Sequence, residues 1–164
     1  MHRVIVATFL IALVVVVGEV EAQTAASVND EVRGLIVGGQ LDSALTILKR
    51  ALSTDSLNVS LLIHLSDVQK AKGQSKARRT TLERIIRIQP RAIDARLEIA
   101  QGLLEARQLD SAAQYAYAAL AQSNRRSADA YYWLGRIHGE AGRSDSALVH
   151  YRWAWILLPS GELF

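Results

Sequence analysis

The chain contains no cysteine and only two prolines, and both scarcities limit what it can be. Without cysteine it can form no disulfide, no thiolate metal site and no cysteine nucleophile. Pro90 and Pro159 each follow a segment of helical periodicity, where a residue that cannot continue a helix is expected. Half of the 164 residues are apolar, which is enough for one domain with a core. The composition therefore predicts an all-α protein.

One long apolar run stands at the N-terminus. Met1–Arg3 carries positive charge, residues 4–17 form a run that is apolar except for Thr8, and Val20 and Ala22 lie at the spacing that signal peptidase prefers. The run is shorter than the roughly 20 apolar residues that a spanning helix needs. We expect residues 1–22 to be a signal peptide cleaved after Ala22, with only transient membrane contact, and the protein to be periplasmic or secreted. The alternative is an inner-membrane anchor formed by uncleaved residues 4–17.

The net charge of the chain is only +3, but basic residues are concentrated in the middle of the sequence. The basic residues there face only Glu83; they are Lys70, Lys72, Lys76, Arg78, Arg79, Arg84, Arg87 and Arg91. Such a surface could attract an acidic peptide, phospholipid headgroups or nucleic acid. No aromatic residues interleave these charges, as single-strand binding requires. We therefore expect a solvated helix face and no nucleic-acid partner.

A six-residue motif recurs along the chain. It occurs at Gly39–Ala44, Arg107–Ala112 and Gly142–Ala147, and a related segment, Gly73–Arg78, lies midway through the longest gap. The period is therefore about 34 residues, which is typical of arrays of two-helix units. The Asp and Ser of the motif are expected to accept hydrogen bonds from free N–H groups at the start of the second helix. Such arrays usually serve as binding surfaces.

The periodicity places helices at eight positions, with bounds uncertain by a few residues: 26–38, 42–53, 59–72, 76–88, 93–106, 109–122, 127–141 and 144–157. The closing alanine of each motif and the residue four positions later, which is Leu48, Leu82, Ala116 or Tyr151, mark one buried stripe. In the last pair of helices, Ala147 and Gly135 are expected to face each other where the helices cross.

The last unit resembles the tetratricopeptide repeat, W-x2-L-G-x2-Y…A-x3-F…P. The matching residues are Tyr131, Leu134, Gly135, His138, Gly142, Ala147, Tyr151, Ala154 and Pro159. Other units match fewer columns: Arg78 takes the Ala column of the second, and Glu31 the Leu column of the first. The resemblance implies a right-handed α-solenoid of about four antiparallel helix pairs over residues 23–159, with units at about 25–58, 59–92, 93–127 and 128–161 and a short tail at 160–164.

In this family the first helix of each unit lines a concave groove that binds a peptide or protein. Transferred by position, the resemblance implies the partner-binding residues Asn29, Arg33, Asp67, Lys70, Asp94, Gln101, Asp129, Tyr132 and Arg136. These residues mix signs of charge. They depart from the lysine, asparagine and arginine clamp with which one subfamily holds the C-terminal carboxylate of chaperones, so that ligand is not expected.

Histidine is the first place to look for catalysis or a metal. His138 and His150 lie on the two helices of the last unit and could approach each other, but two imidazoles without a placed carboxylate make a poor zinc site. His138 fills the Tyr column, which favours a packed, hydrogen-bonded histidine. The chain has no G-x-S-x-G, no Walker loop and no dinucleotide fingerprint. We expect neither an enzyme nor a cofactor or metal.

The C-terminal segment Tyr151–Leu158 is nearly apolar all round, whereas arrays normally end on a helix with a polar outer face. Trp153, Trp155 and Ile156 are therefore predicted to form an interface, for instance in a homodimer. The alternative is that Ser160–Phe164 folds back as a cap.

Three functions follow from these patterns. The best supported is an exported interaction scaffold that binds its partner through the groove. The second is a structural subunit that oligomerises or docks to an envelope complex through the C-terminal helix. The third and most distant is a hydrolase or enzyme accessory that uses His138 and His150.

Overall fold

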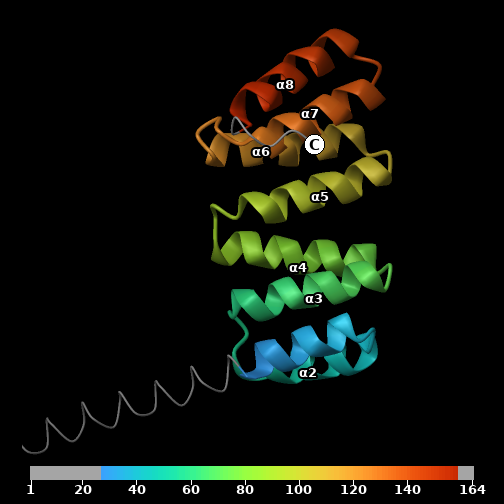
Figure 1. The fold of residues 1–164 in the computed structure, drawn as a ribbon, viewed down its shortest axis with the longest axis vertical. Helices are drawn as coiled ribbons and strands as arrows, with labels where there is room; N and C mark the ends of the chain where they lie inside the picture. The colour runs from blue at the N-terminus through green and yellow to red at the C-terminus, as the bar shows by residue number, and fades with distance from the viewer. Residues whose placement is uncertain (1–26, 159–164) are drawn as a thin grey trace, which may run out of the picture. The chain divides into compact units, whose positions relative to one another are not determined.

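A computed structural model describes residues 27–158, and all regular structure in that range is helical (Figure 1). Helical residues 27–37 are followed by α2 (Leu41–Thr54), α3 (Val59–Ala71), α4 (Ser75–Ile88), α5 (Ile93–Glu105), α6 (Leu109–Gln122), α7 (Ala128–Glu140) and α8 (Ser144–Leu157). The all-α prediction is confirmed, and the expected helix bounds agree to within a few residues. Within this range no helix is long and apolar enough to cross a membrane. The predicted signal peptide and the predicted cap both lie outside the described residues.

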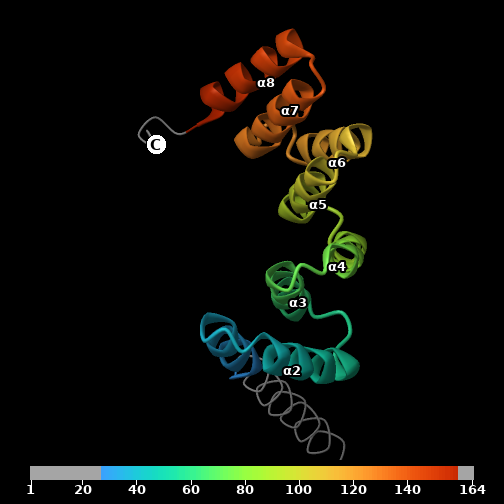
Figure 2. The ribbon, with the colours of Figure 1, turned by 90° about the vertical axis from the view of Figure 1, so that its right-hand side faces the viewer.

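The chain divides into two compact units, one ending at Lys72 and the other beginning at Gly73, where the composition alone indicated one domain. In the first unit α2 packs on α3, and Leu48 and Leu62 are fully buried. In the second unit α4 packs on α5, α5 on α6, α6 on α7, and α7 on α8. Figures 1 and 2 show α7 and α8 side by side.

Small residues let the helices of the second unit approach closely. Ala112, Ala116 and Ala119 form a fully buried stripe on α6, as the repeated alanine columns predicted. Between α7 and α8 the expected register is wrong by one turn. A Cβ at Gly135 would meet the ring of Tyr151, whereas a Cβ at Gly139 would lie 4.0 Å from the Cβ of Ala147. The tyrosine ring therefore rests on the open backbone of α7.

The recurring motif is a helix stop followed by a helix start. Gly142 has φ +71°, and the amide of the next residue, Arg143, donates to the carbonyl of His138 at 2.9 Å. This is a Schellman turn, which needs a left-handed residue and therefore favours glycine. In the copy Arg107–Ala112, Arg107 takes the same conformation at φ +59°, with the amide of Gln108 donating to the carbonyl of Leu103 at 2.9 Å.

The predicted capping by the motif's Asp and Ser is wrong. The residues that precede α2, α4, α6 and α8 are Gln40, Gln74, Gln108 and Arg143, and none makes a side-chain capping bond. Because α2, α6 and α8 begin before the motif's Asp and Ser, Asp42, Asp110 and Asp145 lie inside the first turn, where a negative charge interacts favourably with the positive end of the helix dipole. Side-chain caps occur instead at Asn58 of α3 and Ser127 of α7.

Candidate binding surfaces of the second unit

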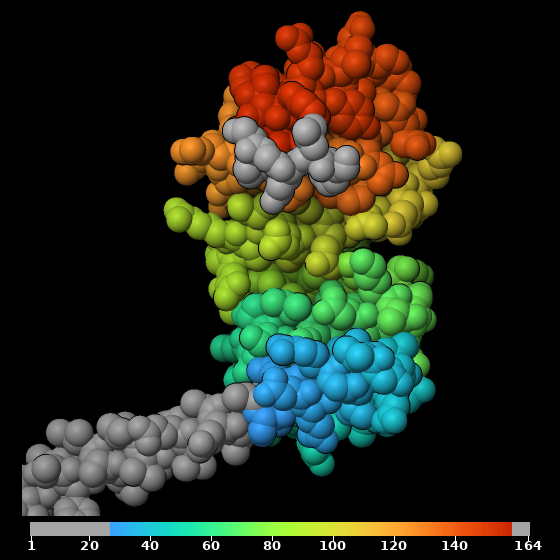
Figure 3. Space-filling model, viewed as in Figure 1, coloured from blue at the N-terminus to red at the C-terminus, as the bar shows by residue number. Residues whose placement is uncertain are grey.

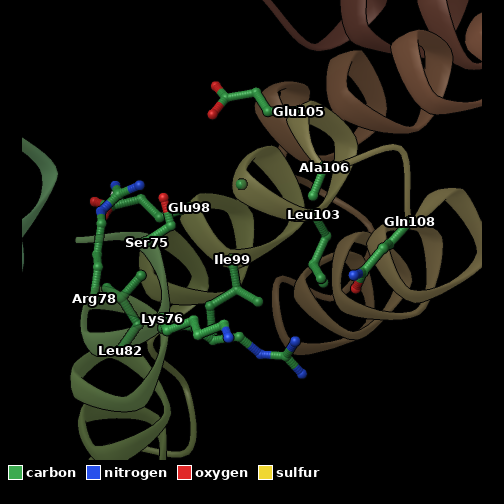
Figure 4. Close-up of a pocket in the computed structure, with 12 residues that line it drawn as sticks. Ser75, Lys76, Arg78, Leu82, Glu98, Ile99, Leu103, Glu105, Ala106 and Gln108 are labelled. Carbon is green, nitrogen blue, oxygen red and sulfur yellow. The ribbon is translucent and has the colours of Figure 1, made fainter. Parts of the chain in front are cut away.

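A cavity of about 300 Å³ opens between α4, α5 and the start of α6 (Figure 4). Figure 4 shows Ile99 and Leu103 projecting from α5 between α4 and Gln108. With Leu82 of α4 they give the cavity an apolar floor. Gly102 also lines it, and a Cβ built there would touch nothing within 4 Å. The volume is at the lower end of those found for ligand sites.

Arg78 closes one side of this cavity and contradicts the expected solvated basic face. The residue is 8% exposed, and its Nη2 donates to Oε2 of Glu98 on α5 at 2.5 Å. Its Nε is buried and has no hydrogen-bond partner within the described chain. The aliphatic stem fills the position where the repeat pattern has alanine, and the guanidinium reaches the next helix. Arg78 therefore belongs to the packing of α4 on α5.

Two further members of the basic segment are also paired. Nε of Arg79 lies 3.0 Å from Oε1 of Glu83, and the Tyr115 hydroxyl donates to the same oxygen at 3.1 Å. The hydrogen bond to Glu83 raises the pKa of Arg79 above its ordinary value. In the first unit Lys72 pairs with Asp42 of α2 at 2.8 Å. The expectation that these basic residues face only Glu83 is therefore wrong.

A second hollow, of about 190 Å³, lies between α5 and α7 and brings together two of the predicted groove residues. We call it the α5–α7 hollow; it is lined by Gln101, Leu104, Glu105, Arg107, Trp133, Arg136 and Glu140. Both acidic groups in it have partners: Glu105 accepts from Gln101 at 3.0 Å, and Glu140 pairs with Arg107. Arg136 instead lies over the indole of Trp133, 5.0 Å from the ring centroid, without a carboxylate partner among residues 27–158.

The other predicted groove residues of the second unit lie outside this hollow. Tyr132 is exposed on α7, with its ring centroid 5.8 Å from that of Trp133. Asp94 and Asp129 are exposed in the first turns of α5 and α7. Transfer by position missed five of the seven lining residues, and Trp133 is the aromatic one among them. The run of aromatic residues from Tyr131 to Trp133 was the available signal in the sequence.

The remaining predicted groove residues belong to the first unit. Asn29 is half-buried, and its Oδ1 has no hydrogen-bond partner in the described part of the chain. Arg33 lies 3.7 Å from Asp30, one turn away on the same helix. Asp67 and Lys70 are exposed on α3. No site is assembled from these four side chains within the described part of that unit.

His138 and His150 meet, as their places on the paired helices suggested. Their rings stack with centroids 5.0 Å apart, and the Tyr117 hydroxyl of α6 lies 2.9 Å from Nε2 of His138 and 3.3 Å from Nε2 of His150. One hydroxyl proton can serve only one imidazole, so the other imidazole must donate to the tyrosine oxygen. Both Nδ1 atoms are buried without a partner in the described range. No group of three or more potential metal ligands occurs among the described residues.

The surroundings of this pair favour neutral imidazoles. Burial lowers the pKa of His138 below its ordinary value, with a smaller contribution from the positive charge of Arg143. Burial likewise lowers the pKa of His150, followed by repulsion from His138. Tyr131, on α7, has its ring 6.0 Å from that of His150 and stacks on Trp153 at 6.0 Å. Protonation would therefore place two like charges in contact within an aromatic cluster.

We expect acid to destabilise the second unit through these histidines. Their folded-state pKa values lie below the ordinary 6.5, so the unfolded chain binds protons first as the pH falls. The stabilisation they give is complete above about pH 6.5 and is lost below it. Thermal unfolding followed by tryptophan fluorescence reports this unit alone, since all three tryptophans, Trp133, Trp153 and Trp155, lie in it.

The control for this prediction is a pair of matched variants. The double replacement of His138 and His150 by Gln should flatten the fall in melting temperature between about pH 6.5 and 5, whereas His64→Gln, on α3 of the first unit, should not. An equally steep fall in the double variant would mean that other groups cause the acid sensitivity.

No protein-family model matches the sequence, and no curated protein matches it. Solved structures do match. A crystal structure of MamA is 23% identical with a TM-score of 0.68, over 77% of this chain and 73% of that one. A crystal structure of MamA protein is 22% identical with a TM-score of 0.70, over 79% and 70%. MamA 41-end from Desulfovibrio magneticus RS-1 is 18% identical with a TM-score of 0.69, over 79% and 73%.

The fold is an all-α solenoid. At these identities the likeness shows the fold alone, and it is consistent with repeats of the tetratricopeptide type.

Proposed function

We propose that this protein is an exported interaction scaffold of about four tetratricopeptide-like helix pairs, and that it binds an acidic peptide segment of a protein partner at the α5–α7 hollow. The observation that carries the proposal is the convergence of Gln101, Trp133 and Arg136 around one concave space. Export is supported by the charged start, short apolar run and small-residue site of residues 1–22. An intact mass that still includes residues 1–22 in the mature protein would contradict export by cleavage.

The chemistry of the hollow favours a carboxylate. Arg136 is held over an indole and keeps its guanidinium edge available, and a carboxylate can receive two parallel hydrogen bonds from that edge. Trp133 offers an apolar surface beside it. A volume of about 190 Å³ suits one side chain rather than a whole small molecule. Because the lining residues stand on packed helices, little ordering is needed when a ligand binds.

The test uses peptides selected on the purified chain from a random-sequence display library. Arg136→Glu should weaken the selected peptides by at least about tenfold, since it replaces the cation with a like charge, which corresponds to about 1.4 kcal/mol. Arg87→Glu makes the same charge change on an exposed position of α4, away from the hollow, and should change affinity less than about twofold. Peptides without acidic residues, or equal losses in the two variants, would contradict this site.

A second function, assembly through the C-terminal helix, is favoured by a separate observation. Trp155 and Ile156 of α8 are 66% and 62% exposed. Large apolar side chains gathered on one exposed helix face indicate a contact surface rather than a solvated one. This function does not depend on the α5–α7 hollow.

A further inference from the structure

The outer side of α8 carries two apolar ridges. Of the described residues of this helix only Ala147 and Ala154 are buried. Leu148 and Trp155, seven positions apart, are 61% and 66% exposed, and Val149 and Ile156, also seven apart, are 52% and 62% exposed. Positions seven apart lie on the same side of a helix, two turns along. Figure 3 shows α8, in red, at the surface of its unit.

Two opposite charges lie between these ridges. Asp145 and Arg152 are also seven positions apart, and their direction around the helix falls between the Leu148 ridge and the Val149 ridge. Both are exposed, and neither makes an ion pair within the described residues. They are separated by about 10 Å along the helix, so they do not neutralise each other within one copy. We call these two charges and the two ridges the α8 outer face.

We propose that the α8 outer face binds the same face of a second copy of this chain, with the two α8 helices antiparallel about a twofold axis. An axis level with Leu148 and Val149 places Asp145 opposite the partner's Arg152, and Arg152 opposite the partner's Asp145. It also places Leu148 against the partner's Leu148 and Val149 against the partner's Val149, because a twofold axis keeps each ridge on the same side of the pair. Trp155 and Ile156 then pack over the turn that precedes the partner's α8. This inference deepens the second function proposed above and is independent of peptide binding.

The two charges favour a second copy of the chain over a bilayer, and an antiparallel over a parallel pairing of the two α8 helices. A parallel pair of α8 helices would set Asp145 against the partner's Asp145 and Arg152 against the partner's Arg152, which is unfavourable. A bilayer would have to take up both charges in the middle of the apolar face. Only the antiparallel pair satisfies both charges at once with the ridges in contact. The α8 outer face comprises six residues, whereas a standard interface has about 20 to 30 residues on each side, so the dimer should be weak and concentration-dependent.

Trp153, which was predicted to belong to the interface and is 48% exposed, also contacts its own chain. Its ring stacks on Tyr131 of α7, with centroids 6.0 Å apart and an interplanar angle of 23°. It stands on the side of α8 that faces the histidine cluster rather than between the two ridges. Trp153 and Trp155 therefore provide a matched pair of exposed tryptophans, of which Trp153 stacks on a ring of α7 and Trp155, at 66% exposed, has no ring partner among the described residues.

A charge-swap series measured by sedimentation velocity tests the proposal on the full chain. The wild type should pass from monomer to dimer as its concentration is raised. Asp145→Arg and Arg152→Asp should each weaken the dimer by at least about tenfold, because each replaces an attraction with a repulsion at both symmetric positions. The double variant should recover most of the wild-type affinity, since it exchanges the two charges. A wild type that stays monomeric, or a double variant no better than the singles, would overturn the proposal.

Two further measurements separate dimer contacts from folding and from the groove. Trp155→Ser should weaken the dimer with little change in melting temperature, whereas Trp153→Ser should lower the melting temperature with little change in dimer affinity. Selected peptides should bind Trp155→Ser as they bind the wild type, so failure of the dimer and failure of the α5–α7 hollow are distinguishable. An unchanged dimer in Trp155→Ser would place the interface elsewhere and overturn the proposal. Binding of phosphatidylcholine and phosphatidylglycerol vesicles by a monomeric wild type would do the same.

Discussion

Gly135→Leu should lower the free energy of unfolding of the second unit by about 3 kcal/mol, at the upper end of the usual cost of overpacking. A Cβ at this position lies 2.6 Å from Cδ1 and Cε1 of Tyr151 and 3.0 Å from Cγ, far inside van der Waals contact. A rotation of the Tyr151 side chain cannot relieve this contact, because Cγ, the ring atom closest to the main chain of Tyr151, is also too close. Either α8 moves away from α7 or the tyrosine leaves the interface. Urea unfolding followed by tryptophan fluorescence measures the loss.

Gly102→Ala provides the matched control, since it adds a Cβ to another helical glycine of the same unit. No atom lies within 4 Å of that Cβ. The variant should therefore gain up to about 1 kcal/mol from the better helix propensity of alanine. If Gly135→Ala and Gly102→Ala changed stability by the same amount, the close approach of Tyr151 to α7 would be wrong.

Glu98→Gln should destabilise the second unit by about 2 kcal/mol, because it leaves the nearly buried guanidinium of Arg78 without its counter-charge. Removing one partner of a fully buried pair costs about 3 to 5 kcal/mol. The Glu98 side chain is 37% exposed, so solvent reduces that cost. Chemical unfolding at neutral pH measures the change.

The double variant Arg78→Met with Glu98→Gln should recover most of this loss. A methionine of similar length fills the same space without a charge, and replacing a buried ion pair by apolar side chains is often neutral or stabilising. Arg79→Met breaks an exposed pair on the same helix and should cost less than about 1 kcal/mol. Equal stability of Glu98→Gln and the wild type would mean that Arg78 finds water or another acceptor.

The sequence predicted the parts of this protein that repeat. Each helix has the six-residue motif, or the related segment Gly73–Arg78, at one of its ends, so several copies of one pattern fix the bounds closely. Buried columns such as Ala112 and Ala116 follow from the same repetition. His138 and His150 could be brought together because they occupy the two helices of the best-matching unit.

The parts that do not repeat could not be predicted in the same way. Arg78 stands where the repeat pattern has alanine. Nothing near it in the sequence indicates that its partner is Glu98, which lies 20 residues later on the next helix. Trp133 lines the α5–α7 hollow although it occupies no groove column. The predicted contact between Gly135 and Ala147 was wrong because the repeat pattern shows only which residues are small. The ring of Tyr151 covers Gly135, and Ala147 therefore lies next to Gly139.

The Schellman turns also bear on how such a chain can lengthen. At Gly142 the carbonyl groups of His138 and Gly139, near the end of α7, accept hydrogen bonds from Arg143 and Gly142 within the turn itself. A duplication that runs from one such turn to the next, about 34 residues, would therefore bring its own backbone pairing with it. The added segment would have to supply only a complementary apolar side. Such an array can therefore lengthen during evolution by duplication of whole two-helix units, because each duplicated unit carries a turn whose backbone groups are already paired.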